Sequence, residues 1–160
     1  MTTTPRDLRP IPKGVSKFDM RRHVRELCAA YSIGIQIRNY PRATASAQWR
    51  MIWIPEVRSE VTYAKALHEI GHVVCGHVFD TNVNILTREG EAWEWARDNA
   101  IIWTPRMDEK ACKWATTYVV NMAIRMRRGN KQWKHRPVAF PPANDPIWKF
   151  TNVIPKEANV

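Results

Sequence analysis

The sequence has few cysteines and no long apolar run. Its three cysteines, Cys28, Cys75 and Cys112, are widely separated, and this odd set excludes a disulfide framework and favours a reducing compartment. No apolar stretch approaches the roughly 18 residues that a membrane-spanning helix needs. The N-terminal residues also lack the apolar core of a signal peptide. We therefore expect a cytoplasmic protein that does not associate with membranes.

Acidic residues are scarce relative to basic ones, and they are unevenly placed. The chain carries 25 Lys and Arg against 15 Asp and Glu, for a formal net charge of +10. Basic residues crowd both ends, whereas residues 59–98 are locally acidic, as a cation site requires. Basic flanks can attract acidic partners or nucleic acid, and Trp133 could stack on a base. Because no recognised nucleic-acid motif accompanies this charge, nucleic acid is considered but not favoured as a partner.

The length of 160 residues predicts one domain with one core. Residues 1–14 are rich in Pro, Thr and Arg and are predicted to form a flexible N-terminal segment. Residues 15–128 carry the periodic patterns and are predicted to form the folded domain. Residues 129–160 are interpreted as a basic, Pro-rich C-terminal extension. No internal repeat is present.

Alternating runs predict strands at residues 33–38 and 47–54. Periodic runs predict helices that begin at Ser16 or Asp19, at Ser59, near Thr87 and at Thr104, the last with Pro105 at its first position. The expected fold class is α+β, with a small antiparallel sheet packed on the helices. An edge of such a sheet could hold an extended peptide by strand addition.

The most informative motif is the pentapeptide His68-Glu69-Ile70-Gly71-His72. It lies in the predicted helix at residues 59–78, so His68 and His72, four residues apart, project from one face. This is the H-E-x-x-H arrangement, in which two histidines bind zinc and the Glu acts on a water at the metal. Gly71 costs roughly 1 kcal/mol relative to Ala inside a helix, and this predicts close packing against a neighbouring element.

A zinc site of this kind needs a third protein ligand. Glu89, Glu91 and Glu94 all compete for this role, because they lie at the start of the next predicted helix, which runs to about residue 103. Glu91 is preferred, since it lies at the edge of an apolar stripe, and Glu94 is the second choice. His77 follows His72 by five residues, about 140° further around a helix, so it is interpreted as a C-terminal helix residue rather than a ligand.

These residues resemble the ImmA/IrrE family of small metallopeptidases. The resemblance rests on the His68–His72 motif, on Glu91-Ala92-x-x-Trp95-Ala96, and on the apolar stretch that ends in Thr104-Pro105. The chain departs from the family in having Trp93 and Trp95 where Asn and Phe are usual. The resemblance implies a minimal zincin-like fold, a gluzincin-like zinc site with Glu91 as the third ligand, and a helix-turn-helix repressor as substrate. Many relatives are encoded in phages and mobile elements.

The sequence therefore predicts a zinc-dependent endopeptidase that cuts a specific protein, plausibly a DNA-binding repressor. His68, His72 and Glu91 would hold Zn²⁺, and Glu69 would act as the general base. No residue is assigned to stabilise the oxyanion, and Tyr63 is expected to point elsewhere. The alternative is a non-cleaving module that sequesters a repressor or binds nucleic acid through its basic flanks. An intact Glu69 argues against this alternative, because a purely structural zinc site needs no general base.

Overall fold

The structure is a computed structural model that describes residues 14–78, 83–133 and 136–152. The predicted flexible segment at residues 1–14 lies outside the described residues except for Gly14, as does the end of the C-terminal extension beyond residue 152. The described elements are, in chain order, α1 (Lys17–Ala30), β1 (Gly34–Ile37), β2 (Thr44–Ser46), β3 (Met51–Ile54), α2 (Glu60–Val74), α3 (Ile85–Asn99), α4 (Pro105–Arg127), β4 (Gln132–Trp133), β5 (Arg136–Pro137) and the 3-10 helix η1 (Pro146–Phe150).

The helices and strands confirm a mixed α+β fold, but the main sheet is not purely antiparallel. Its strand order is β1-β3-β2, with β1 parallel and β2 antiparallel to β3. The predicted strand at residues 47–54 begins only at Met51, because residues 47–50 form a turn in which Arg50 has a φ of +47°. The short strand β2 therefore pairs with β3 across this turn, and β1 pairs with the opposite edge of β3. β2 is left at an edge of the sheet.

Three of the four predicted helix starts are confirmed by their caps. Ser16, Ser59 and Thr104 each accept a hydrogen bond from a backbone N–H in the first turn of α1, α2 and α4. α2 ends at Val74, earlier than expected, since Gly76 has a φ of +69° that ends the helix. α3 begins earlier than expected, at Ile85 with Asn84 as its cap. This shift decides which glutamate faces the histidines.

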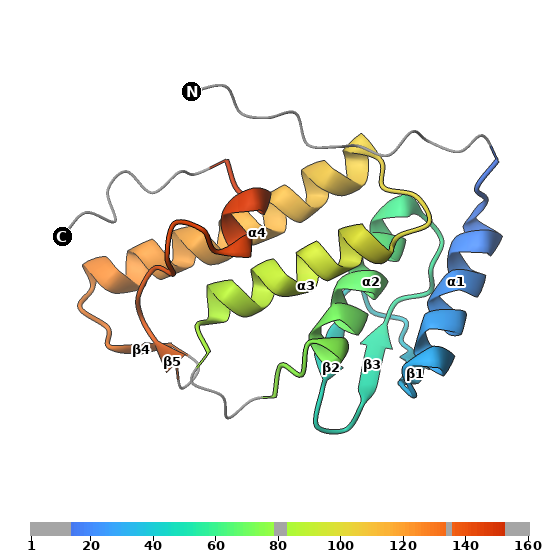
Figure 1. The fold of residues 1–160 in the computed structure, drawn as a ribbon, viewed down its shortest axis with the longest axis horizontal. Coiled ribbons are helices and arrows are strands. Elements are labelled where there is room, and N and C mark those ends of the chain that lie inside the picture. The colour runs from blue at the N-terminus through green and yellow to red at the C-terminus, as the bar shows by residue number, and fades with distance from the viewer. Residues whose placement is uncertain (1–13, 79–82, 134–135, 153–160) are drawn as a thin grey trace.

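The His68–His72 motif lies on α2, the central helix of the fold. α2 contacts α1, α3, α4, β2 and β3, and Figure 1 shows α3 and α4 running side by side next to it. α2 and α3 approach closely at Gly71, where an added Cβ would lie 2.7 Å from the carbonyl oxygen of Ala92. The predicted close packing of Gly71 is therefore confirmed. The contact brings the Ala92 backbone of α3 against α2.

Part of the predicted C-terminal extension belongs to the core. η1 packs against α3 and α4 (Figure 1), and its Ile147 and Phe150 side chains are fully buried. Asp145 caps η1 and accepts a hydrogen bond from Thr87 at 2.5 Å. A boundary at residue 128 thus does not separate a folded domain from a free extension. Within the described part of the chain, no helix is long and apolar enough to cross a membrane.

Gly90 is the position at which η1 meets α3, so we expect Gly90→Ala to destabilise the fold. An added Cβ would lie 2.2 Å from the backbone nitrogen of Ile147, and backbone cannot move aside without displacing η1. We expect a loss of about 1–3 kcal/mol in the free energy of unfolding, as for other overpacked sites, measured by urea denaturation. Gly34→Ala is the control, because the atoms nearest its Cβ are in the flexible Met51 side chain. Equal losses in the two variants would contradict the assigned packing.

Candidate metal centre

The two histidines of the motif converge as the helical spacing requires. The Nε2 atoms of His68 and His72 lie 3.0 Å apart. His68 is buried, and its ring stacks on Trp93 of α3 with centroids 4.0 Å apart. Packing of this kind fixes the orientation of a ligand before a metal binds.

Glu89 completes a three-residue group with these histidines. Its carboxylate oxygens lie 3.2 Å from Nε2 of His68 and 3.6 Å from Nε2 of His72. Ligands at about 2.0–2.1 Å around a tetrahedral ion are separated from one another by roughly 3.3 Å. The three donors therefore fit a metal ion, and His68, His72 and Glu89 form a group that could hold one. The nearby histidines hold the pKa of the Glu89 carboxyl below its usual range despite burial.

The expectation of Glu91 as the third ligand is corrected by this geometry. Glu91 lies two residues, or roughly 200°, around the helix from Glu89, and its carboxylate contacts His77 Nε2 at 2.8 Å. Glu94, the second choice, forms an ion pair with Lys149. Of the three candidate glutamates, Glu89 is the one whose carboxylate lies within 4 Å of both His68 and His72.

A signal in the sequence could have identified Glu89. The buried residues of α3 recur at steps of three and four, and Glu89 lies within this stripe; its members are Ile85, Leu86, Glu89, Gly90, Ala92, Trp93 and Ala96. Glu91 instead shares its face with Trp95 and the exposed Asp98. The expected start of the helix near Thr87 excluded Ile85 and Leu86 from the pattern and so concealed the stripe.

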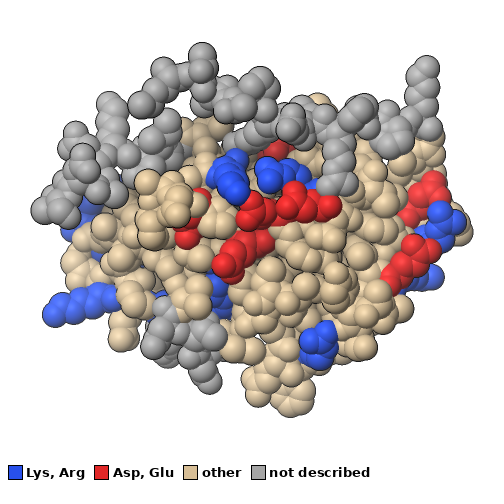
Figure 2. All heavy atoms as spheres, viewed as in Figure 1, with Lys and Arg blue, Asp and Glu red and all other residues tan. Residues whose placement is uncertain are grey.

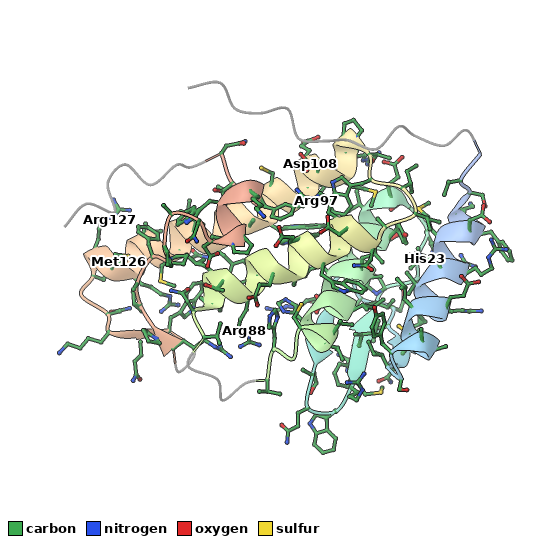
Figure 3. The ribbon with its side chains drawn as sticks, in the orientation of Figure 1. His23, Arg88, Arg97, Asp108, Met126 and Arg127 are labelled. Atoms are coloured by element: carbon green, nitrogen blue, oxygen red, sulfur yellow. The ribbon has the colours of Figure 1, made fainter. Side chains whose placement is uncertain are left out.

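His77 and Glu91 form a second set of contacts, on the Nδ1 side of the His72 ring. Nδ1 of His72 lies 2.8 Å from Nδ1 of His77, and the other ring nitrogen of His77 contacts Glu91. Arg88, labelled in Figure 3, reaches from the start of α3 to the His77 carbonyl oxygen at 2.5 Å. This chain of contacts orients a ligand histidine in the way that outer partners do in metal sites. Burial, with the positive charge of His72, lowers the pKa of His77 to about 4, so the ring is neutral.

His77 is not part of α2, contrary to the expectation of a C-terminal helix residue. The helix ends at Val74, and the His77 amide donates to the His72 carbonyl oxygen across the turn at Gly76. Its role is therefore set by its contacts with His72 and Glu91 rather than by the helix dipole. Cys75, the residue after α2, is exposed.

Glu69 lies next to the histidine pair and lines the same cleft as His68 and Glu89. Burial, opposed by the positive charge of His72 and assisted by the negative charge of Glu89, raises the pKa of Glu69 to about 7. A general base works best when its pKa lies near the operating pH. A bound cation would favour the ionised carboxylate and so lower this pKa.

The site opens into a cleft of about 320 Å³ between α2, α3, α4 and the segment before β2. The residues that line it are Arg42, Ala43, Lys65, His68, Glu69, Glu89, Trp93, Trp114, Thr117 and Tyr118. A larger groove of about 670 Å³ runs along α4. Its lining contains none of the side chains His68, His72 and Glu89. This groove is therefore separate from the candidate metal site.

Tyr118 is the residue at this site that sequence reasoning missed. It lies in α4, one helical turn after Trp114, and both side chains line the cleft. The negative charge of Glu89, followed by burial, raises the pKa of Tyr118, and the hydroxyl hydrogen-bonds to Glu89. Tyr118 therefore stays protonated and donates into the site. No local motif marks it, because its position depends on how α4 packs.

Two other aromatic residues are excluded from the site. The Tyr63 hydroxyl contacts Nδ1 of His23 at 2.7 Å and accepts from the Ile101 amide, and Figure 3 shows His23 on α1. Tyr63 thus points away from the motif, as expected. Trp133 is buried against Tyr118, with Arg125 over its ring. It is therefore poorly placed to stack on a base.

The outer surface of α3 is locally acidic, unlike the chain as a whole. Figure 2 shows Asp and Glu side chains gathered over α3, next to a few basic ones. Glu91, Glu94 and Asp98, all in α3, line one hollow. The locally acidic character predicted for residues 59–98 is therefore visible at the surface of α3.

Comparison of the chain with protein-family models, curated proteins and solved structures gives no match. The functional argument therefore rests on the geometry of the site.

Proposed function

We propose that the protein is a zinc-dependent peptidase. The observation that carries this proposal is the adjacency of a carboxylate, Glu69, to a His-His-Glu group at the base of a cleft. A three-ligand set with two histidines and one carboxylate is the set that catalytic zinc sites use, since the fourth position stays open. A structural site would instead be closed by a fourth protein ligand, and no fourth His, Cys, Asp or Glu joins the group among the described residues.

Each residue has a role that its position supports. His68, His72 and Glu89 hold the metal, and His77 and Glu91 orient His72. Glu69 accepts a proton from the attacking water and passes it to the leaving amine. The Tyr118 hydroxyl donates a hydrogen bond to the Glu89 carboxylate. Bound zinc supplies a Lewis acid and lowers the pKa of a coordinated water toward about 7.

The cleft lies beside the exposed edge of the small sheet. β2 has β3 as its only partner strand in the described sheet, and Ala43, just before β2, lines the cleft. An extended peptide could add to this edge and cross the metal group. The proposed substrate is a specific protein, and a DNA-binding repressor is the first candidate. The family resemblance alone suggests the repressor.

The proposal predicts that cleavage depends on the metal. We expect the protein to cut peptides in a degenerate library, as read by mass spectrometry, with about one zinc ion per chain bound. Removal of zinc by a chelator should abolish cleavage, and added Zn²⁺ should restore it. A zinc-loaded protein that cuts no member of the library would contradict the proposal, as would cleavage that survives verified removal of metal.

A further inference from the structure

The cleft has a basic wall as well as its acidic metal group. Arg42 and Lys65 are the two basic residues in its lining, and Glu69 and Glu89 are the two acidic ones. A divalent ion bound at the histidines and Glu89 would balance the two carboxylates. The charges of Arg42 and Lys65 would then be uncompensated within the cleft.

Lys65 is held in place by its neighbours. Its ammonium donates to the Pro41 carbonyl oxygen at 3.0 Å and lies 4.9 Å from the centre of the Trp114 ring. It is four residues before Glu69 and therefore shares its face of α2. These contacts position the ammonium at the cleft wall but leave it without a carboxylate ion-pair partner within 4 Å among the described residues.

Arg42 is exposed, lines the same cleft, and follows Pro41, whose carbonyl oxygen Lys65 contacts. It forms no ion pair with a carboxylate in the described part of the chain, whereas Arg21, Arg22 and Arg58 all do. It lies near enough to Tyr118 to oppose the rise in pKa that Glu89 and burial cause there. Its guanidinium is thus available in the cleft, next to the metal group, and guanidinium groups bind carboxylates in bidentate fashion.

We propose that Arg42, assisted by Lys65, binds a carboxylate of the substrate beside the bond to be cut. This inference rests on the proposed peptidase function and specifies its substrate class. The carboxylate comes either from an Asp or Glu side chain or from the C-terminus of the substrate. The second source would make the protein a carboxypeptidase rather than an endopeptidase.

The test compares four versions of a peptide selected from the degenerate library. The residue next to the cut is Glu or Gln, and the C-terminus is a free acid or an amide. A charge-assisted hydrogen bond is worth about 10- to 100-fold in binding, so wild-type kcat/KM should fall by that factor when the recognised carboxylate is removed. Sensitivity to Glu→Gln assigns the side chain, and sensitivity to amidation assigns the C-terminus.

Variants locate the effect in the cleft. Arg42→Ala should remove the preference for the carboxylate by lowering kcat/KM for the acidic peptide only. Arg42→Glu should reverse the preference, so that the uncharged peptide is cleaved faster than the acidic one. Arg38→Ala is the matched control, because Arg38 lies over Trp53 rather than in the cleft lining. A preference that persists in Arg42→Ala, or equal cleavage of all four peptides, would overturn the carboxylate site but leave the peptidase standing.

A binding measurement separates this site from the peptidase function. Glu69→Gln protein, titrated calorimetrically with the same four peptides, reports carboxylate recognition without turnover. Tighter binding of the acidic peptide, lost in Glu69→Gln/Arg42→Ala, supports the site independently of the rate of cleavage. Equal affinities for all four peptides would overturn it.

Discussion

Glu89→Ala is expected to abolish stoichiometric zinc binding, whereas Glu91→Ala is expected only to weaken it. Glu89 supplies one of three ligands, with oxygens 3.2 and 3.6 Å from the histidine nitrogens. Glu91 touches His77 and acts on His72 through that ring. Loss of such an outer partner typically costs about 10- to 100-fold in metal affinity. Zinc content by elemental analysis and Kd by competition with a chromophoric chelator measure both effects.

Glu94→Ala is the matched control for this pair, since Glu94 lies on the same helix but pairs with Lys149. Its zinc content should equal that of the wild type. Circular dichroism of each variant without metal shows whether the fold survives, which keeps loss of a ligand distinct from loss of structure. If Glu91→Ala lost zinc completely and Glu89→Ala retained it, the register of α3 assigned here would be wrong.

The features that the sequence predicted correctly are those that depend on residues close together in the chain. The His68–His72 spacing places both imidazoles on one face of any helix, and the caps at Ser16, Ser59 and Thr104 are hydrogen bonds within a single turn. Gly71 also signalled a close contact before its partner was known. Such features depend on a few neighbouring residues, so a single sequence is sufficient to find them.

The features that sequence did not predict depend on how separate elements meet. The third ligand follows from the start of α3 at Ile85 and from the contact of Gly71 with Ala92. The antiparallel pairing of β2 with β3 follows from a turn at residues 47–50, where Arg50 adopts a positive φ, and β1 lies parallel to β3 at its other edge. Tyr118 enters the site only because α4 packs beside α2 and α3. No local pattern specifies these contacts between elements, and the predicted ligand, Glu91, lies two residues after the glutamate that faces the histidines.

Glu69→Gln is expected to lower peptide cleavage by about 10²- to 10⁴-fold, the usual contribution of a general base. The amide keeps the size and shape of the side chain but cannot accept the proton of the attacking water at neutral pH. Zinc content should be unchanged, because Glu69 is not among the three metal-binding side chains. The measurement is kcat/KM on one peptide from the library, together with zinc per chain for the same preparation.

Glu26→Gln serves as the control for this substitution, because Glu26 is an exposed residue of α1 that pairs with Arg22 and does not line the cleft. It should cleave at the wild-type rate. If Glu69→Gln kept both its zinc and wild-type kcat/KM, Glu69 would not be the general base. Loss of cleavage with full zinc content would instead separate the chemical step from metal binding, and it would exclude a role for this site that is purely structural.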